Sequence, residues 1–316
     1  MLDQITINPF IIFLLGTILL YYSSELLVSN AIIISKEFNI SKLVIGGTII
    51  ALGTSLPEIV VSILANIKGN SNIVIGNIVG SNVANIGFVL GISLYFKAIY
   101  IDKHDTRYKY NILAMLFFTI VFHIMLLFGG IPRLAGFILL CLYVVYFLIM
   151  VKYFMFNYRH KFENYDSKIF INIIKVIGGI ILIYFGSNLF IDGAIGISKK
   201  IGIHDLSIGM TIVALGTSAP ELITSLNALK KNEEMLAIGN IVGSNIANIV
   251  FAGGISSMIR DIYIKYNEIV YFSNIMLFIT IILILIILFS KKIYKIYSLL
   301  FISIYFIFIY LNFYNN

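Results

Sequence analysis

The chain contains one long segment twice. Residues 16–93 match residues 179–256 at a constant offset of 163 without a gap, and about 42 of the 78 aligned positions are identical. The identical positions include polar ones, as in Ala51-Leu-Gly-Thr-Ser-Leu-Pro-Glu58 and Ala214-Leu-Gly-Thr-Ser-Ala-Pro-Glu221. Two unrelated apolar segments would not share polar residues at matching places by chance. The fold must therefore contain the same structural unit twice.

The composition around this repeat is that of an integral membrane protein. Hydrophobic residues make up 60% of the 316 residues and charged residues only 12%, whereas soluble domains are about a quarter charged. A membrane-spanning helix needs about 20 mostly apolar residues. Ten segments meet that length, and the first lacks the basic leader of a signal peptide. The ten are residues 10–30, 43–67, 73–96, 111–130, 134–155, 170–192, 206–229, 235–258, 268–290 and 296–313.

The two copies are predicted to cross the membrane in opposite directions. The offset spans five predicted helices, and an odd number of crossings reverses the second copy. We therefore predict an all-α polytopic membrane protein with ten transmembrane helices in two inverted five-helix repeats. The first repeat covers residues 1–155, a short cytoplasmic linker covers 156–168, and the second repeat covers 169–316. Inverted repeats are typical of transporters, whose binding site lies near mid-membrane where the repeats meet.

The basic residues predict orientation and location. With the N-terminus outside, about fifteen Lys and Arg residues fall in inside loops and about six in outside loops. Because inside loops carry the excess of Lys and Arg, we expect a multi-pass protein of the cell (plasma) membrane with both termini extracellular. The net charge of +7 is scattered over short loops. Nucleic acid is therefore not an expected partner, and the protein is expected to act as a monomer in the lipid bilayer.

The octapeptide predicts a broken helix. Pro57 has no N–H and its ring crowds the carbonyl of Gly53, so a helix breaks or kinks there, and Pro220 repeats this in the second copy. We expect the break to free backbone carbonyls around Ala51–Gly53 and Ala214–Gly216. Irregular backbone at membrane depth is tolerated only where it is buried in protein or lines a cavity. Helices two and seven of the ten are therefore predicted to be broken at Gly-Thr-Ser-x-Pro-Glu.

Each repeat supplies oxygen donors. Where the chain is helical, Glu58 shares a face with Thr54 and Ser55. The matching residues of the second copy are Glu221, Thr217 and Ser218. The next helix of each copy carries a polar stripe with a spacing of four: Asn77, Ser81 and Asn85, and Asn240, Ser244 and Asn248. Small residues that allow close helix approach accompany the stripes: Gly76, Gly80, Gly239 and Gly243.

Oxygen donors without His or Cys predict a site for hard cations. Ca²⁺ takes about 6–8 oxygen ligands, and Na⁺ accepts the same donors, whereas zinc and copper recruit His or Cys. One Ca²⁺ would neutralise the two negative charges of Glu58 and Glu221. Because an uncompensated carboxylate at mid-membrane costs at least a few kcal/mol, the empty carrier should resist crossing. This penalty favours exchange over uniport.

These motifs resemble the α-repeats of the sodium/calcium exchanger family, within the cation/Ca²⁺ exchanger superfamily, in its compact prokaryotic form. The resemblance rests on both Gly-Thr-Ser-x-Pro-Glu motifs and on both Gly-Asn-Ile-Val-Gly-Ser-Asn-x-Ala-Asn stretches, residues 76–85 and 239–248, and covers nearly the whole chain. It implies exchange of three Na⁺ for one Ca²⁺ by alternating access, with the first and sixth helices sliding as a gate. Such transport would be electrogenic and would need no cofactor.

The resemblance also implies a role for each motif residue. Glu58 and Glu221 would be the central carboxylate ligands, and Asn85 would complete the first half. The other ligands would offer hydroxyl oxygens, main-chain carbonyls and outer Na⁺ sites: Thr54, Ser55, Thr217 and Ser218; Ala51 and Ala214; and Ser81 and Ser244, respectively. Asn248 departs from several relatives, which have Asp there. A neutral amide argues against K⁺ dependence and against a third carboxylate.

Three other functions stay open. An H⁺/Ca²⁺ or other cation antiporter would share the fold, although the Gly-Asn-x-x-Glu signature of the H⁺-coupled branch is absent. An intramembrane enzyme would need a nucleophile with a base, paired aspartates or histidine ligands. The only histidine in a predicted span is His123, outside both motifs, so the protein is not expected to be an enzyme. A passive channel could use broken helices, but two carboxylates in an inverted pair favour binding and exchange.

Overall fold

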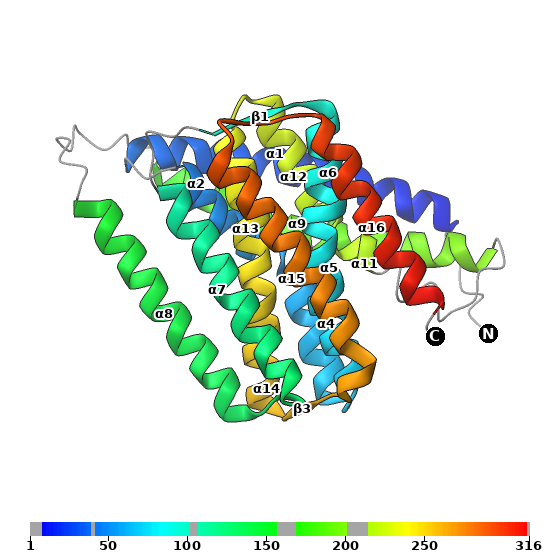
Figure 1. Cartoon of the computed structure of the whole chain (residues 1–316). Helices are drawn as coiled ribbons and strands as arrows, with labels where there is room; N and C mark the ends of the chain where they lie inside the picture. The colour runs from blue at the N-terminus through cyan, green and yellow to red at the C-terminus, as the bar shows by residue number, and fades with distance from the viewer. Residues whose placement is uncertain (1–7, 39–41, 102–106, 157–168, 201–213, 315–316) are drawn as a thin grey trace.

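The computed structural model describes residues 8–38, 42–101, 107–156, 169–200 and 214–314. This part of the chain is almost entirely helical (Figure 1). In the ranges below, the label η marks wider, π-helical turns. The elements of the first half are α1 (Pro9–Glu37), α2 (Lys42–Ile45), η1 (Gly46–Ile50), α3 (Ala51–Thr54), α4 (Leu56–Ile67), α5 (Ser71–Ala84), η2 (Asn85–Leu90), α6 (Gly91–Phe96), β1 (Ile99–Tyr100), α7 (Arg107–Leu127), β2 (Gly130–Ile131) and α8 (Arg133–Phe156). The elements of the second half are α9 (Ile169–Lys200), α11 (Ala214–Thr217), α12 (Ala219–Lys230), α13 (Glu234–Ala247), η4 (Asn248–Ile255), α14 (Ser256–Ile259), β3 (Ile262–Tyr263), α15 (Tyr266–Phe289), β4 (Lys292–Ile293) and α16 (Ile296–Tyr314).

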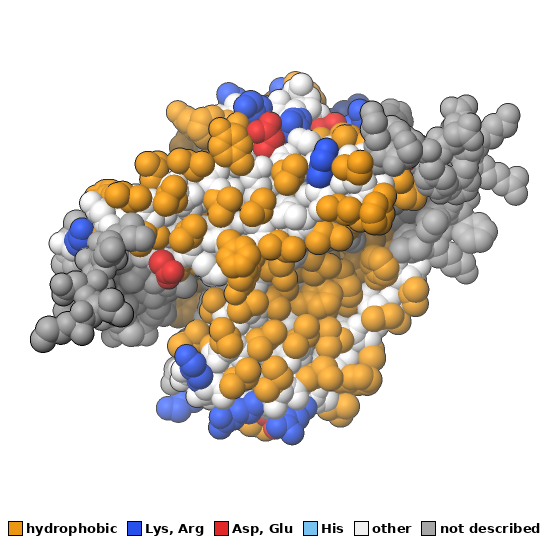
Figure 2. All heavy atoms as spheres, turned by 180° about the vertical axis from the view of Figure 1, so that it is seen from behind, with side chains coloured by type: hydrophobic (Ala, Val, Ile, Leu, Met, Phe, Trp, Pro, Cys, Tyr) orange, Lys and Arg blue, Asp and Glu red, His pale blue; other side chains and the backbone are white. Residues whose placement is uncertain are grey.

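The helices form a polytopic membrane bundle. Within the described ranges, seven helices are long and apolar enough to cross a membrane, and the bent pair Lys42–Thr54 and Leu56–Ile67 would make an eighth. Helices satisfy their own backbone hydrogen bonds, which the bilayer core requires of any spanning segment. Figure 2 shows apolar side chains covering the middle of the molecule, with Lys and Arg gathered mainly at its two ends. The described part of the chain therefore has the predicted all-helical class.

The long helices α1 and α9 pack against each other as an antiparallel pair that crosses the bundle obliquely (Figure 1). A Cβ on Gly16 would lie 2.4 Å from the Phe190 backbone nitrogen, and a Cβ on Gly193 would lie 2.3 Å from that of Phe13. The start of α1 thus meets the end of α9, and only glycine lets the two backbones approach so closely. The two helices contain matched parts of the repeat, and they run in opposite directions.

The centre of the bundle consists of α4, α5, α12 and α13. Helix α4 packs on α5, and α12 packs on α13. Helices α7 and α15 pack against each other, and they also contact α13 and α5 respectively. Helix α8 lies at the edge of the bundle (Figure 1). The central helices are therefore enclosed by other helices, and α13 is buried along nearly its whole length.

Two short antiparallel strand pairs join loops at opposite ends of the bundle (Figure 1). Strand β1 pairs with β4, with Ile99 opposite Ile293, and β2 pairs with β3, with Ile131 opposite Ile262. The strands were not predicted, because each is only two residues long and leaves no recognisable pattern in the sequence. They connect the loops around α7 to the loops around α15.

Most predicted spans correspond to described helices. The first helix continues to Glu37, beyond the predicted end at residue 30, because an oblique helix needs more residues to cross the bilayer. Of the predicted linker 156–168, only Phe156 is described, and the first part of the predicted span 206–229 also lies outside the described residues. The ten-span inverted arrangement and the boundaries of the two repeats therefore stay predictions.

Candidate cation site

Both octapeptides interrupt a helix at a serine. Helix α3 ends at Thr54 and α4 begins at Leu56, with Ser55 between them, and the helical segments on either side are bent by 47°. In the second copy, Ser218 lies between α11 and α12. Each proline lies in the first turn of the following helix, where its missing N–H costs no hydrogen bond. Each glutamate lies in the same first turn, directly after the interruption.

The Ala51 carbonyl is not free, contrary to the prediction. It accepts a backbone bond from Ser55 at 3.0 Å, and the hydroxyl oxygens of Thr54 and Ser244 lie 3.2 and 3.5 Å from it. Proline at position 57 removes only the N–H whose helical partner is the Gly53 carbonyl. The bond to Ala51 therefore survives, and its oxygen belongs to a hydrogen-bonded cluster.

This cluster joins the first interruption to the carboxylate of the second copy. Ser55 Oγ donates to Glu221 Oε1 at 2.9 Å, and Ser244 Oγ donates to the same oxygen at 3.3 Å. Thr54 Oγ1 donates to Asn240 Oδ1 at 3.2 Å and lies 3.4 Å from Ser244 Oγ. Side chains from α3, the following serine, α12 and α13 therefore meet at one point. Residues about 160 to 190 positions apart in the sequence share this cluster.

Glu58 has fewer hydrogen bonds than Glu221. Its side chain is 1% exposed, and neither carboxylate oxygen has a partner of ordinary geometry in the described part of the chain, although the Thr217 hydroxyl interacts with it. Ser218 Oγ, Ser81 Oγ and Glu221 Oε2 also lack a partner there. The two carboxylates lie close enough to interact electrostatically. Buried charged oxygens without partners are costly unless a cation lies between them.

Two asparagines of the predicted stripes hold the helices that carry the carboxylates. Asn77 Nδ2 donates to the Glu58 main-chain carbonyl and to Ser62 Oγ, both at 2.9 Å. Asn240 Nδ2 donates to the matching two groups of the second copy at 3.4 and 3.2 Å. These bonds fix α4 against α5 and α12 against α13. They position both glutamates without presenting an amide oxygen from residue 77 to the carboxylates.

Four further amides lie where α5 and α13 change into π-helical turns. Asn85 Nδ2 donates to Asn245 Oδ1 at 3.0 Å, and Asn248 Nδ2 donates to Asn82 Oδ1 at 3.2 Å. The Oδ1 atoms of Asn85 and Asn248 are buried and have no partner in the described part of the chain. Asn82 and Asn245 were not predicted as site residues, because they lie outside the stripes of spacing four. Their repetition at the offset of 163 was the available signal.

The predicted site residues are buried at the centre of the bundle. Eleven of the twelve have described side chains that are at most 1% exposed: Ala51, Thr54, Ser55, Glu58, Ser81, Asn85, Thr217, Ser218, Glu221, Ser244 and Asn248. Of Ala214, only its place as the first residue of α11 is described. The arrangement offers carboxylate, hydroxyl, amide and main-chain oxygens, the donors that hard cations prefer.

Comparison with known proteins identifies the family of this chain. A sequence model of the family described as "Sodium/calcium exchanger protein" matches residues 8–152 and 171–314. The chain belongs to the sodium/calcium exchanger family. This is a family of cation/Ca²⁺ antiporters, so the prediction of a transporter and not an enzyme agrees with it.

Individual relatives match the exchanger over most of its length. It is 39% identical over 246 residues to "Uncharacterized membrane protein MJ0091" of Methanocaldococcus jannaschii, which covers 78% of this chain and 80% of the relative. It is 30% identical over 328 residues to "Sodium/calcium exchanger MaX1" of Methanosarcina acetivorans, and the match covers 89% of this chain and 91% of that relative. A solved structure of the sodium-calcium exchanger NCX_Mj, soaked with Na⁺ and Ca²⁺, superposes with a TM-score of 0.83 at 36% identity, covering 95% of this chain and 97% of that one. The predicted family and the all-helical membrane fold are thus confirmed.

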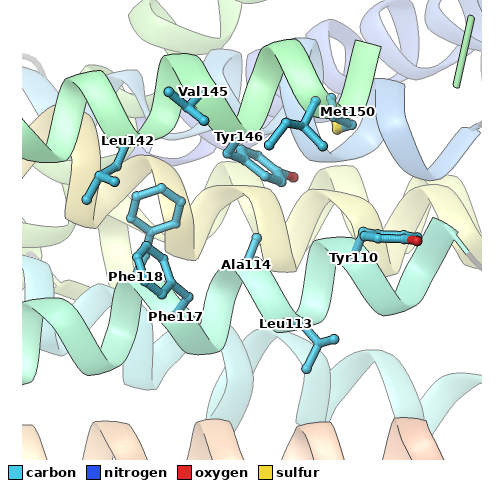
Figure 3. Close-up of a pocket in the computed structure, with 10 residues that line it drawn as sticks. Tyr110, Leu113, Ala114, Phe117, Phe118, Leu142, Val145, Tyr146 and Met150 are labelled. Carbon is cyan, nitrogen blue, oxygen red and sulfur yellow. The ribbon is translucent and has the colours of Figure 1, made fainter. Parts of the chain in front are cut away.

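The exchanger also has a groove between α7 and α8. Its volume is about 370 Å³, and its lining is apolar apart from the hydroxyls of Tyr110 and Tyr146 (Figure 3). Tyr146 donates to Asn111 Oδ1 at 2.9 Å. None of the predicted site residues lines this groove, so it is separate from the candidate cation site.

Proposed function

We propose that this exchanger moves Ca²⁺ across the membrane in exchange for Na⁺, with Glu58 and Glu221 as the central ligands. The proposed stoichiometry is three Na⁺ per Ca²⁺, without K⁺. With two carboxylates, a Ca²⁺-loaded site carries no net charge and a site loaded with three Na⁺ carries +1. Each cycle would therefore move one positive charge. The names of MaX1 and NCX_Mj support Na⁺ and Ca²⁺ as the substrates.

The observation that carries this proposal is a pair of buried carboxylates without cationic partners. Apart from the contact of the Thr217 hydroxyl with Glu58, both oxygens of Glu58 and Oε2 of Glu221 lack a donor of ordinary geometry in the described part of the chain. The ion pairs found among the described residues, those of Lys42, Lys97 and Lys231, involve neither glutamate. Leaving such charges unpaired costs several kcal/mol. A bound Ca²⁺ or Na⁺ would offset that cost, and neutral oxygens nearby would complete its coordination.

The remaining ligands are proposed from their positions around these carboxylates. The hydroxyl ligands are Thr54, Ser55, Thr217 and Ser218, with Ser81 and Ser244 at outer Na⁺ sites. The main-chain and amide ligands are Ala51, Ala214, Asn85 and Asn248, and the Ala51 carbonyl would give up a hydroxyl contact to bind the cation. The unpartnered Oδ1 atoms of Asn85 and Asn248 support the amide assignments. The neutral amide at position 248 supports independence from K⁺.

We further propose ten spans in two inverted repeats, in a monomer of the plasma membrane with both termini extracellular. The antiparallel packing of α1 and α9, which contain matched segments, supports the inversion. The two spans beyond the eight apolar ones would be the interrupted helix containing α11 and α12, and α16. In this orientation the ion pairs of Lys42 with Glu233 and Lys97 with Glu234 lie on the inside face.

The test is Ca²⁺ uptake by proteoliposomes loaded with Na⁺ and diluted into Na⁺-free buffer with radioactive Ca²⁺. Wild type should take up Ca²⁺ only when Na⁺ is inside, with no effect of K⁺. Uptake should be faster when the interior is positive, since each cycle would carry one net positive charge out of the liposome. Glu58→Gln and Glu221→Gln should each lower uptake by about 100-fold or more, because each removes a charge-assisted ligand bond. Asp261→Asn is the matched control, because Asp261 lies at the rim and accepts from the Arg133 backbone N–H at 2.7 Å.

The outcomes separate the candidate functions. Uptake driven by a pH gradient instead of Na⁺ would assign the exchanger to H⁺-coupled transport. Uptake that is indifferent to membrane potential would contradict the 3:1 stoichiometry. Normal uptake by both glutamate variants would remove these residues from the site.

A further inference from the structure

Two buried methionines contact two of the amides at the centre of the bundle. Asn82 Nδ2 donates to Met276 Sδ at 3.7 Å, and Asn245 Nδ2 donates to Met115 Sδ at the same distance. All of these side chains are buried. Met115 lies on α7 and Met276 on α15, the helices that pack against α13 and α5 (Figure 1). Each thioether therefore contacts an asparagine three residues before a proposed amide ligand.

The thioether makes the two ends of the amide inequivalent. A thioether sulfur accepts a weak hydrogen bond and donates none, so the NH₂ group of Asn82 points at Met276. The Oδ1 atom of Asn82 then faces Asn248 and accepts from its Nδ2 at 3.2 Å. The Oδ1 atom of Asn248 is consequently left on the other side, buried and without a partner in the described part of the chain. The sulfur of Met276 thus fixes the amide of Asn82, and Asn82 in turn fixes the amide of Asn248.

Reversing either amide would be unfavourable. A flipped Asn248 would place its oxygen against the oxygen of Asn82, and a flip of both would place an oxygen against the sulfur of Met276. Two acceptors facing each other in a buried site lose a hydrogen bond and repel. A flipped Asn248 would also present an NH₂ donor to the cation in place of an oxygen. The same reasoning applies to Met115, Asn245 and Asn85.

We propose that Asn82 and Asn245 are positioning residues, which orient Asn248 and Asn85 so that an amide oxygen from each faces the transported cation. Met276 and Met115 supply the fixed acceptor at the far end of each relay. This inference rests on the proposed function, because it concerns the same site. The two relays cross between the repeats. Asn82 of the first repeat orients Asn248 of the second, and Asn245 of the second repeat orients Asn85 of the first.

The test is a pair of double-mutant cycles on Ca²⁺ transport. Asn82→Leu keeps the shape of the side chain but removes both hydrogen bonds. It should raise the Ca²⁺ concentration for half-maximal uptake by about 10-fold, the size expected for losing one correctly oriented ligand, while the maximal rate changes by less than about 2-fold. In an Asn248→Ala background, Asn82→Leu should add almost nothing, because the oriented group is already gone.

The matched control is the cycle of Asn82→Leu with Asn85→Ala. Asn85 is only three residues away on the same helix, yet it is oriented by the other relay, so these two effects should multiply. An undiminished effect of Asn82→Leu in the Asn248→Ala background would overturn the proposal. Equal coupling to Asn85 would do so as well, since it would indicate general damage to α5.

A milder variant and a second readout keep the test independent of folding and of the transport assignment. If Asn82→Leu does not purify as folded protein, Met276→Leu replaces it, with the same direction and an expected change of about 2–3-fold because the bond to sulfur is weak. Binding is read from the rise in unfolding temperature on adding Ca²⁺ alone. If Ca²⁺ stabilises the wild type but internal Na⁺ drives no Ca²⁺ uptake, the proposed function is refuted. The double-mutant cycles would then be measured by the rise in unfolding temperature on adding Ca²⁺. Additive cycles in a wild type that transports would refute the relay alone.

Discussion

Helices α5 and α13 share the sequence Gly-Asn-Ile-Val-Gly-Ser-Asn but have different surroundings. On α13, a Cβ at Gly239 would lie 2.4 Å from a backbone carbonyl of α2, and a Cβ at Gly243 would lie 2.4 Å from the Gly47 carbonyl. On α5, a Cβ at Gly76 or Gly80 meets no described atom within 4 Å, and Gly76 is exposed. The predicted close helix approach is therefore present at α13, and no described segment makes it at α5.

The polar groups follow the same division. Beside α13, the hydroxyls of Ser55 and Ser244 donate to Glu221. Beside α5, the matching Ser218 and Ser81 have no partner among the described residues, and Glu58 is correspondingly less satisfied. Among the described residues, the copy of the motif on α13 therefore has more close contacts and hydrogen bonds than the copy on α5.

The two copies also differ in sequence at the packed face. Lys42 Nζ lies 2.5 Å from Glu233 Oε2, and Lys97 Nζ lies 2.6 Å from Glu234 Oε1. The positions that match the two acids, 70 and 71, are Asn and Ser, and the position that matches Gly47 is Met210. The copies therefore cannot form the same set of contacts, and the comparison predicts that matched substitutions will have unequal effects.

The largest expected difference is between Gly243→Ala and Gly80→Ala. Gly243→Ala should destabilise the exchanger by about 1–3 kcal/mol, because the new methyl group would overlap backbone atoms that cannot move aside. Gly80→Ala, the matched substitution on α5, should cost less, since its new methyl group meets no atom of the described residues within 4 Å. Thermal unfolding of both variants in detergent would measure this. Equal losses would contradict the difference in packing between α5 and α13.

A smaller difference is expected between the two glutamates when no ion is bound. Glu58→Gln should raise stability in Na⁺- and Ca²⁺-free buffer by about 1–2 kcal/mol more than Glu221→Gln does, because Glu221 already accepts two hydroxyl bonds and Glu58 accepts none of ordinary geometry. The measurement is the unfolding temperature with and without Ca²⁺. Wild type should gain stability from Ca²⁺, and both variants should lose that gain. Identical ion-free shifts would show that the hydroxyl bonds to Glu221 matter little.

The smallest effect is expected at the ion pair of Lys42 with Glu233. Lys42→Met and Glu233→Gln should show a coupling energy of about 0.5 kcal/mol in a double-mutant cycle, because the lysine is 37% exposed and solvent screens the pair. The pair of Lys231 with Glu25, at 3.6 Å and more exposed, is the control and should show almost no coupling. If the coupling of Lys42 with Glu233 is no larger than that of the control pair, Lys42 has no role in holding α2 on α13.

Much of the fold and of the candidate site could be read from residue pattern. Apolar runs predicted the helical membrane class, and the duplicated octapeptide singled out Glu58 and Glu221, both of which are buried at the centre. The prediction of a free Ala51 carbonyl was wrong, because Pro57 removes only the N–H that would bond to the Gly53 carbonyl, and the bond from Ser55 to Ala51 remains. Asn82 and Asn245 were not predicted because they lie outside the stripes of spacing four. Their partners, Met276 and Met115, lie outside the gapless repeat, so the pattern did not show these contacts.

The sequence by itself determined that this protein is a helical membrane protein with a duplicated set of buried oxygen donors, because apolar length, proline chemistry and repeated polar residues act locally. Only the tertiary structure decided which donors pair across the halves, which glutamate oxygens stay unsatisfied, and which way each amide faces. Those properties depend on contacts between residues some 130 to 190 positions apart. Identical segments also meet different neighbours among the described residues, and only the structure shows which contacts each copy makes.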